Sequence, residues 1–178
     1  MSNESDSVTY IIKIINVGSW GVGKTSLALR YTQNKFNVNY LPTLGVDFYS
    51  KMITLEDNVK IKLVLFDTLG QERYSSLRKR YYVGAHGAVI VYDVTRKETS
   101  DNIEQWIEEV SEKCPNIPII IVGNKTDLQQ ERQVELEEVE QKFGRVHTVL
   151  ESSAKLGEGV EDIYTLVAKK VLKKINQC

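Results

Sequence analysis

Residues 18–25 read Gly-Ser-Trp-Gly-Val-Gly-Lys-Thr and match the pattern G-x-x-x-x-G-K-[ST]. An apolar run, residues 10–17, precedes them and is typical of a buried strand. Glycines at this spacing let the backbone turn its N–H groups toward a phosphate chain. We expect Lys24 to reach the terminal phosphates and Thr25 to offer its hydroxyl to Mg²⁺, at the positive end of a helix over residues 25–33. The alternative, a glycine-rich turn that binds nothing, is disfavoured by the strand before it and the helix after it.

Apolar strand-like runs alternate with helical patterns along the chain. The expected strands cover residues 10–17, 46–55, 59–66, 88–94, 119–123 and 149–152, and most lack the polar alternation of a half-exposed strand. Apolar residues at helical spacing occur at 103–110, with Ser100 as the expected cap, and at 160–175. Residues 56–58, Glu-Asp-Asn, separate two adjoining strands as a hairpin turn would. We therefore predict a three-layer α/β domain, whose six-stranded sheet is mostly parallel with one antiparallel edge strand, and about five helices.

The composition narrows the class of protein. The chain has 178 residues and a net charge of −1, which indicates one domain of ordinary size with no electrostatic preference for nucleic acid. Its two cysteines, Cys114 and Cys178, are too far apart for a disulfide framework, and the two histidines add no zinc-site spacing. Residues 1–7 are short and polar, and polar residues interrupt the apolar run after them. We therefore expect neither a signal peptide nor a membrane span, and a cytosolic location.

A second motif indicates which nucleotide the phosphate loop would hold. Residues 124–127 read Asn-Lys-Thr-Asp and follow an expected strand, at the carboxyl edge of the sheet where α/β proteins bind ligands. The Asp127 carboxylate can accept two parallel hydrogen bonds from the ring N–H and the amine of guanine, whereas adenine offers an acceptor and no amine. Residues 152–155, Ser-Ser-Ala-Lys, can add the Ala154 backbone N–H as a donor to the guanine oxygen. Together the motifs favour a guanine nucleotide and disfavour the alternative of a P-loop kinase or ATPase.

These motifs resemble those of the Ras superfamily of small GTPases, and of its Rab branch in particular, over nearly all of the chain. Three further segments are similar to the Rab pattern: 43–48 (TLGVDF) to switch I and the following strand, 67–74 (DTLGQERY) to switch II, and 80–88 (RYYVGAHGA) to the segment before the next strand. The resemblance implies a P-loop GTPase domain over residues 9–176 that binds GTP or GDP with Mg²⁺ and hydrolyses GTP to GDP and phosphate. It also implies a switch that recruits effectors in vesicle trafficking.

The resemblance assigns roles to single residues of the site. Thr43 would bind Mg²⁺ and the γ-phosphate in the GTP state, and Asp67 would hold Mg²⁺ through water. Phe36 would pack on the guanine, Tyr40 would cover the phosphates, and the Gly70 N–H would sense the γ-phosphate. The metal-binding residues expected are thus Thr25, Thr43 and Asp67, and the expected nucleotide-binding residues are Gly21, Val22, Gly23, Lys24, Thr25, Ser26, Phe36, Tyr40, Thr43, Gly70, Asn124, Lys125, Asp127, Ser153, Ala154 and Lys155.

Two positions beside the expected γ-phosphate depart from the Rab pattern. By resemblance, Gln71 is the catalytic residue, because it orients the attacking water. Trp20 stands where a small residue is usual, and Leu69 replaces the usual alanine. Each adds bulk to a crowded site, so either switch II shifts or the large side chains turn outward over the nucleotide, and we expect slow hydrolysis. Two alternatives remain: a nucleotide-binding scaffold protein with little hydrolysis, and an arrangement in which Trp20 simply lies on the surface and Leu69 fills a local gap.

The expected partners are effectors, exchange factors and GTPase-activating proteins. Phe48, Phe66 and Tyr81 resemble the aromatic effector surface of Rab proteins, although Phe66 replaces their usual tryptophan. We expect a monomer with no nucleic-acid partner, a disordered segment at residues 1–8, and at 177–178 the start of a truncated tail. Rab tails commonly end in two cysteines that are prenylated, so we expect membrane attachment, on the cytosolic face of an endomembrane compartment, to require a lipidated tail that this sequence lacks.

Overall fold

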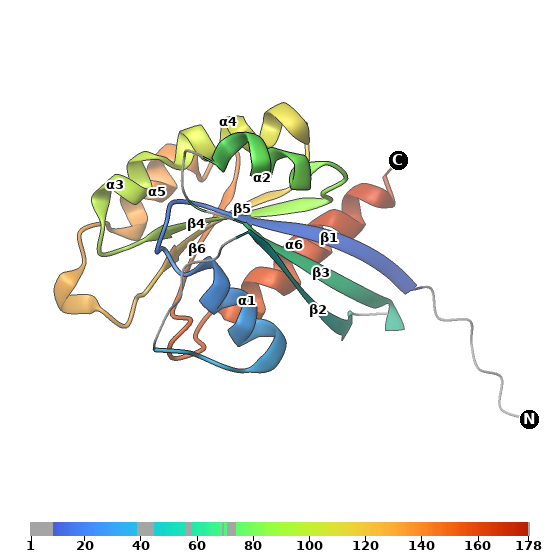
Figure 1. Cartoon of the computed structure of the whole chain (residues 1–178), viewed down its shortest axis with the longest axis horizontal. Coiled ribbons are helices and arrows are strands. Elements are labelled where there is room, and N and C mark those ends of the chain that lie inside the picture. Colours follow the sequence, from blue (N-terminus) through green and yellow to red (C-terminus); the bar gives the residue numbers. More distant parts are fainter. Residues whose placement is uncertain (1–8, 39–44, 56–57, 69, 71–73, 178) are drawn as a thin grey trace, which may run out of the picture.

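The computed structural model describes residues 9–38, 45–55, 58–68, 70 and 74–177, in which strands and helices alternate (Figure 1). The strands are β1 (Thr9–Val17), β2 (Val46–Thr54), β3 (Lys60–Thr68), β4 (Gly87–Asp93), β5 (Ile119–Asn124) and β6 (Thr148–Ser152). The helices are α1 (Lys24–Gln33), α2 (Ser75–Tyr82), α3 (Lys97–Asp101), α4 (Ile103–Lys113), α5 (Leu136–Phe143) and α6 (Val160–Ile175), with a 3₁₀ turn, η3, at Gln129–Glu131. Only Asn102 separates α3 from α4, and as one helical segment they complete the five helices predicted.

The strands form one six-stranded sheet in the order β2-β3-β1-β4-β5-β6. Strand β2 pairs antiparallel with β3, whereas the four other pairings are parallel. The prediction of a mostly parallel sheet with an antiparallel edge strand is therefore confirmed. β4 and β5 are buried along their whole length, as expected for central strands with helices on both faces, and β2 at the edge alternates between exposed and partly buried residues.

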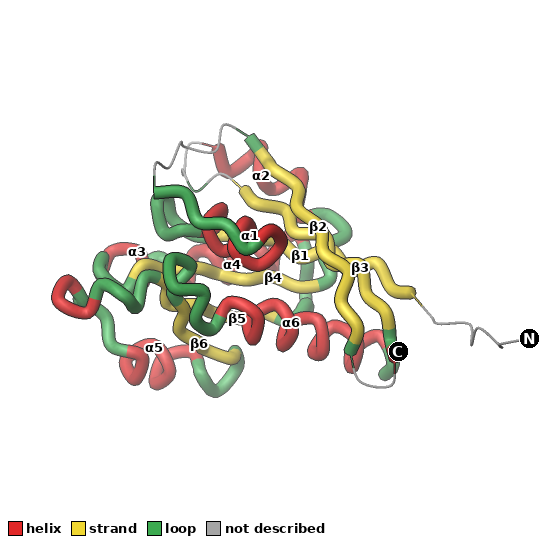
Figure 2. Tube along the Cα trace, turned by 90° about the horizontal axis from the view of Figure 1, so that it is seen from below, coloured by secondary structure: helices red, strands yellow, loops and turns green. Residues whose placement is uncertain are grey.

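Helices cover the two faces of the sheet and make three layers. α1 and α6 lie on one face, and α2, α3, α4 and α5 lie on the other, as Figure 1 shows and Figure 2 repeats from below. Each face has its own apolar core, because alternate residues of one strand point to opposite sides. In β1, Ile14 packs with the α1 and α6 side chains, whereas Ile15 packs with those of α2, α4 and α5. No helix among the described residues is long and apolar enough to cross a membrane.

The helix cap predicted at Ser100 is wrong. Ser100 lies inside α3, where its hydroxyl donates to the Lys97 carbonyl at 2.8 Å, and Asn102 takes the cap position of α4. The hydroxyl is used within its own turn, as serine side chains in helices often are. No helix was predicted at 75–82 or 136–143, where the structure has α2 and α5. In α5, Val139 and Phe143 are buried four residues apart, and this spacing was a signal that the sequence offered.

The parallel strands place their carboxyl ends at one edge of the sheet. Residues 18–23 follow β1 there, and Asp67, Asp93, Asn124 and Ser152 lie at the ends of β3, β4, β5 and β6. Neighbouring strands are in register at these positions, so that Asp93 pairs with Asn124 and Asn124 with Ser152. Loops at this edge are where open α/β sheets bind their ligands.

Candidate functional site

The loop at residues 18–23 depends on glycine at two of its positions. Gly18 and Gly23 adopt φ angles of 142° and 98°, which side chains of L-residues rarely permit. A Cβ on Gly18 would collide with the Val91 carbonyl oxygen, and a Cβ on Gly23 would collide with the Asn124 amide nitrogen. The loop is therefore packed against β4 and β5 as closely as backbone allows, and α1 begins directly after it at Lys24.

The Lys24 side chain crosses the inside of this loop. It is 7% exposed, and its ammonium donates to the carbonyl oxygens of Gly18 at 2.9 Å and Ser19 at 3.0 Å. Burial lowers the pKa of Lys24 to about 8, although the nearby Asp67 carboxylate offsets part of this effect. Gly70 approaches the same ammonium, because a Cβ there would come within 2.5 Å of Lys24 Nζ. The structure thus brings the predicted phosphate lysine and the predicted phosphate sensor together.

Thr25 and Asp67 are the two expected metal residues that the structure describes. The Thr25 hydroxyl donates to Asp67 Oδ2 at 2.5 Å, so the two groups are already side by side although they are far apart in the sequence. A hydroxyl and a carboxylate are oxygen ligands of the kind Mg²⁺ prefers. In the described part of the chain, no three His, Cys, Asp or Glu side chains gather as a metal site. A magnesium ion at this site would therefore be held by Thr25, Asp67, water and phosphate oxygens. The hydroxyl and the carboxylate that are present fit this set of ligands.

Asn124 joins the phosphate loop to the loop after β6. Its side chain is buried, and its amide donates to the Val22 carbonyl at 2.9 Å. Its side-chain oxygen accepts hydrogen bonds from the Ala154 N–H at 3.1 Å and the Ser152 hydroxyl at 3.3 Å. The Ala154 N–H that we expected to face a guanine oxygen is thus directed to Asn124, and a base could use it only as a shared donor.

Asp127 is held in place by the loop after β6. Its Oδ1 accepts a hydrogen bond from the Ser153 hydroxyl at 2.7 Å, and its Oδ2 lies 3.9 Å from Lys155 Nζ. The side chain is 11% exposed and lines the site's cavity, so a carboxylate edge is presented to a ligand in a fixed orientation. Such an edge can recognise two adjacent N–H donors on one base.

One cavity of about 620 Å³ connects these loops. Its volume is typical of a site for a molecule of nucleotide size. Trp20 is 49% exposed and faces this cavity at its rim, so its side chain is turned outward rather than packed inside the protein. Of the residues predicted to bind the nucleotide, the cavity is lined by Gly21, Gly23, Ser26, Phe36, Asn124, Lys125, Asp127, Ala154 and Lys155. Tyr40, Thr43, Leu69 and Gln71 lie outside the described residues.

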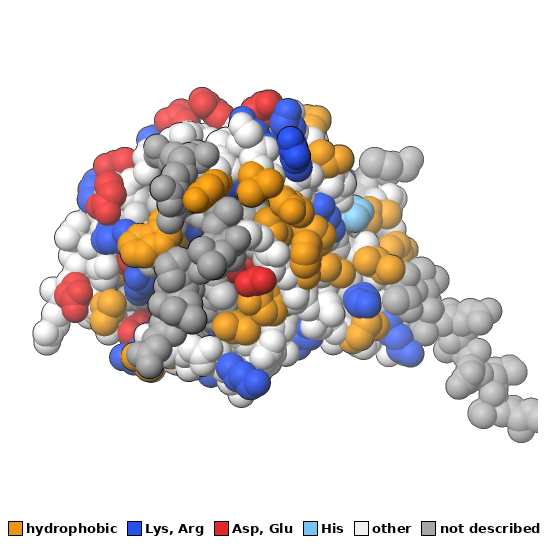
Figure 3. Space-filling view, in the orientation of Figure 1, with side chains coloured by type: hydrophobic (Ala, Val, Ile, Leu, Met, Phe, Trp, Pro, Cys, Tyr) orange, Lys and Arg blue, Asp and Glu red, His pale blue; other side chains and the backbone are white. Residues whose placement is uncertain are grey.

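The three residues expected to form an effector surface lie together. Phe48 of β2 meets Phe66 of β3 edge to face, with ring centroids 4.6 Å apart, and Tyr81 of α2 lies 6.4 Å from Phe48. Phe48 is 56% exposed. Hydrophobic side chains gather across this side of the molecule in Figure 3, and Met52, Leu77 and Val83 are exposed near the same elements.

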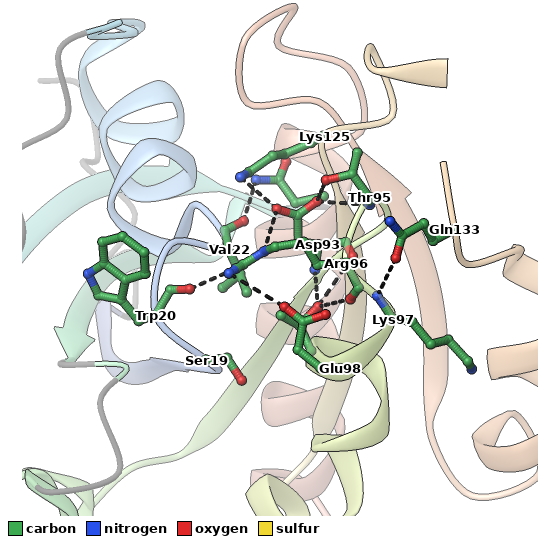
Figure 4. Close-up of polar contacts among 12 residues, drawn as sticks. Ser19, Trp20, Val22, Asp93, Thr95, Arg96, Lys97, Glu98, Lys125 and Gln133 are labelled. Carbon is green, nitrogen blue, oxygen red and sulfur yellow. Dashed lines mark hydrogen bonds and ion pairs between the residues drawn. The ribbon is translucent and has the colours of Figure 1, made fainter. Parts of the chain in front are cut away.

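The sequence motifs missed the residues at the end of β4 and in the turn after it. Asp93, Thr95 and Arg96 also line the cavity, and in Figure 4 the Asp93 carboxylate lies among the side chains of Thr95, Arg96 and Lys125. Lys125 Nζ lies 2.6 Å from Asp93 Oδ2. The position of Asp93 at the end of a buried strand was a signal for a site residue, because a buried carboxylate needs a partner. No sequence pattern indicated Arg96.

Comparison with known proteins shows which family the chain belongs to. Residues 13–173 match the family model described as "Ras family". The GTP-binding protein ypt3 of Schizosaccharomyces pombe (strain 972 / ATCC 24843) is 40% identical over 176 residues, which cover 97% of this chain and 81% of the yeast protein. The chain therefore belongs to the Ras family, in its Rab branch of small GTPases.

Proposed function

We propose that this protein is a switch that binds GTP or GDP with Mg²⁺, hydrolyses GTP slowly, and recruits effectors in vesicle trafficking at an endomembrane surface. The observation that carries the proposal is the Asn124 side chain, which lines the cavity and bonds both Val22 of the phosphate loop and Ala154 of the loop after β6. A pocket with a phosphate cradle at one end and a fixed carboxylate at the other supports a guanine nucleotide.

Within this proposal the predicted site residues have the following parts. Lys24 neutralises phosphate charge, and Thr25 and Asp67 would hold Mg²⁺, which when bound screens the charge that develops on the transferred phosphoryl group. Asp127 reads the base, Phe36 packs against it, and Gln71 orients the attacking water. Phe48, Phe66 and Tyr81 form the surface that effectors contact, while exchange factors and activating proteins act on the segments around it. Equilibrium binding of GDP, GTP and ATP in the presence of Mg²⁺ tests the proposal.

We expect Thr25→Asn to weaken binding of a GTP analogue by about tenfold or more relative to GDP. The substitution removes a hydroxyl ligand of Mg²⁺, and this ligand contributes most to binding when the metal also contacts a triphosphate. The affinity for GTP should therefore fall more than the affinity for GDP. The measurement is the affinity for each nucleotide as the Mg²⁺ concentration is varied. Thr25→Ser keeps the hydroxyl and should retain the parental Mg²⁺ dependence. A Thr25→Asn protein with that same dependence would exclude the assigned role.

We expect the double substitution Trp20→Ser with Leu69→Ala to speed single-turnover GTP hydrolysis by about tenfold or more, or roughly 1.4 kcal/mol in the barrier. Trp20 is half exposed at the rim of the cavity, and in this proposal its indole covers the approach of switch II to the γ-phosphate, so smaller side chains give Gln71 room to orient water. The two single changes should be non-additive because we expect the residues to be close. Gln71→Leu should abolish the gain.

The scaffold alternative predicts a different outcome of the same measurement. If the parent binds GTP but neither the parent nor the double variant hydrolyses it, the protein acts as a nucleotide-binding scaffold. If the parent already hydrolyses GTP as fast as the double variant, Trp20 and Leu69 do not slow the reaction.

A further inference from the structure

Arg96 lies in the turn between β4 and α3 and contacts the phosphate loop. Its Nη2 donates to the Trp20 carbonyl at 2.7 Å, and its Nε donates to Asp93 Oδ2 at 3.3 Å. Its Nη1 is also 3.8 Å from Glu98 Oε1. In Figure 4 the guanidinium sits between the Trp20 carbonyl and the Asp93 carboxylate, and the Trp20 ring points away from it. One planar group therefore connects two elements that border the nucleotide cavity.

The contact continues from Asp93 to the base-reading loop, residues 124–127, which begins at the last residue of β5. Asp93 Oδ2, which accepts from Arg96, is also 2.6 Å from Lys125 Nζ, and Thr95 donates to Oδ1 from its backbone N–H at 2.9 Å and its hydroxyl at 2.6 Å. Burial raises the pKa of Asp93, but the hydrogen bonds from Lys125 and Thr95 outweigh burial and keep the pKa below its ordinary value. Asp93 is thus a carboxylate at neutral pH, and the chain of contacts runs from Trp20 through Arg96 and Asp93 to Lys125.

Arg96 is also close enough to influence the phosphate cradle. It lines the same cavity as Trp20 and Gly21, and a Cβ on Gly21 would lie 3.6 Å from its Nη2. Burial lowers the pKa of Lys24 to about 8, and the positive charge of Arg96 acts in the same direction. The guanidinium therefore adds a second positive charge beside the loop, in addition to that of Lys24.

We propose that Arg96 is a positioning residue that fixes the phosphate loop against the base-reading loop and so slows nucleotide release. The proposal rests on the proposed guanine-nucleotide function. A nucleotide can leave only when the loops around its phosphates and its base loosen. Arg96 joins the backbone of the phosphate loop, at Trp20, to the Asp93 carboxylate, which also pairs with Lys125 of the base-reading loop. A guanidinium can bridge the carbonyl and the carboxylate at once because its donors are arranged as a rigid fork, whereas the compact ammonium of lysine cannot hold the same geometry.

The test measures release of a fluorescent GDP analogue from the Mg²⁺-bound protein. Arg96→Gln should speed release by about tenfold, the factor that corresponds to 1.4 kcal/mol, while the association rate stays within about twofold of the parent. Arg96→Lys keeps the charge but should release nearly as fast as Arg96→Gln. Lys97→Gln is the matched control, because it makes the same charge change one residue away, where the side chain pairs with Asp101 and Glu138 instead. It should release at the parental rate.

Quenching of tryptophan emission by iodide gives a second readout in the GDP-bound protein. Iodide can reach Trp20, which is half exposed, but not Trp106, which is 4% exposed. Release of the Trp20 carbonyl should make quenching more efficient in both Arg96 variants and unchanged in Lys97→Gln.

The outcomes separate this inference from the function on which it rests. A parent protein that binds no guanine nucleotide overturns both. A parent that retains GDP, with Arg96 variants that release it at the parental rate, overturns the role of Arg96 alone. Full rescue by Arg96→Lys would also contradict it, because charge rather than the bridging geometry would then be sufficient. If Arg96→Gln fails to fold, Arg96→Lys decides by the same two readouts.

Discussion

We expect Asp127→Asn to weaken binding of GDP and GTP by about 2–5 kcal/mol, the usual effect of removing one partner of a buried, charged hydrogen-bonded pair. The carboxylate presents two acceptors to adjacent N–H groups of guanine, and an amide replaces one of them with a donor. Ser153 holds the side chain in place through Oδ1, so it has little freedom to find another arrangement. Titration calorimetry of the variant with each nucleotide measures the loss.

A change of base should restore binding to this variant. Xanthine carries a carbonyl where guanine has its amine, and this oxygen can accept a hydrogen bond from the new amide. Asp127→Asn should therefore bind xanthosine diphosphate more tightly than GDP, a gain that misfolding cannot produce. Glu131→Gln is the control, because Glu131 lines the same cavity but lies in the exposed turn η3. GDP binding by Asp127→Asn within a few-fold of the parent would show that another residue reads the base.

The second large effect that we expect is on stability, and it concerns Arg78, which joins α2 to α4 through an ion pair with Glu109. Arg78 is 1% exposed, and its Nε and Nη2 donate to the two oxygens of Glu109 at 2.7 and 2.8 Å. The same carboxylate accepts from the Tyr82 hydroxyl at 2.7 Å and the Ser75 hydroxyl at 3.0 Å, and the guanidinium stacks on the Trp106 ring. We expect Arg78→Met to lower the free energy of unfolding by about 3–5 kcal/mol, because it leaves the Glu109 charge buried without its cation.

Urea-induced unfolding of the nucleotide-bound protein measures this loss against a control in the same helix. Lys79 pairs with Glu112 at 2.6 Å, but that pair is exposed, so Lys79→Met should change stability little. Equal losses for the two variants would mean that the buried pair has no special role.

The Arg78–Glu109 pair also predicts a dependence on pH. Burial raises the pKa of Glu109, but the hydrogen bonds from Arg78 and Tyr82 outweigh burial, so the pKa lies below its ordinary value. A lowered folded-state pKa means that the ionised form stabilises the fold above the unfolded pKa of about 4.5, and that this contribution is lost as pH falls through the folded value. The stability difference between the parent and Glu109→Gln should therefore shrink below about pH 4.5. A difference that stays constant there would contradict the assignment.

The strands were the part of the fold that the sequence predicted best. All six expected strands are present with small shifts at their ends, because apolar runs bounded by polar turns are the direct consequence of burial on both faces of a sheet. Helices at the protein surface were harder to predict, since α2 contains few apolar residues and buries Arg78 through an ion pair rather than an apolar face. The cap at Ser100 failed because local hydrogen bonds of its hydroxyl could not be distinguished from a cap in the sequence.

In the candidate site, too, some residues could be predicted from the sequence and others could not. Lys24 and Asn124, which lie in motifs, both contact the backbone of the loop at residues 18–23, because the motifs encode contacts to a backbone of fixed shape. Their roles toward a nucleotide stay predictions. The role of Arg96 could not be predicted, because its contact with the phosphate loop is to the Trp20 backbone carbonyl, 76 residues away in the chain. Such contacts depend on tertiary packing and leave no spacing in the sequence.

The most direct test of a guanine-nucleotide switch is the nucleotide that the purified protein carries and what displaces it. We predict bound GDP or GTP that is retained in Mg²⁺, is released faster when the metal is chelated, and exchanges with added GDP. ATP at about a thousandfold excess should not displace it, because a site built on paired hydrogen bonds rejects a base that cannot form them. Displacement by ATP as readily as by GDP, or failure to bind either guanine nucleotide, would contradict a guanine-nucleotide switch.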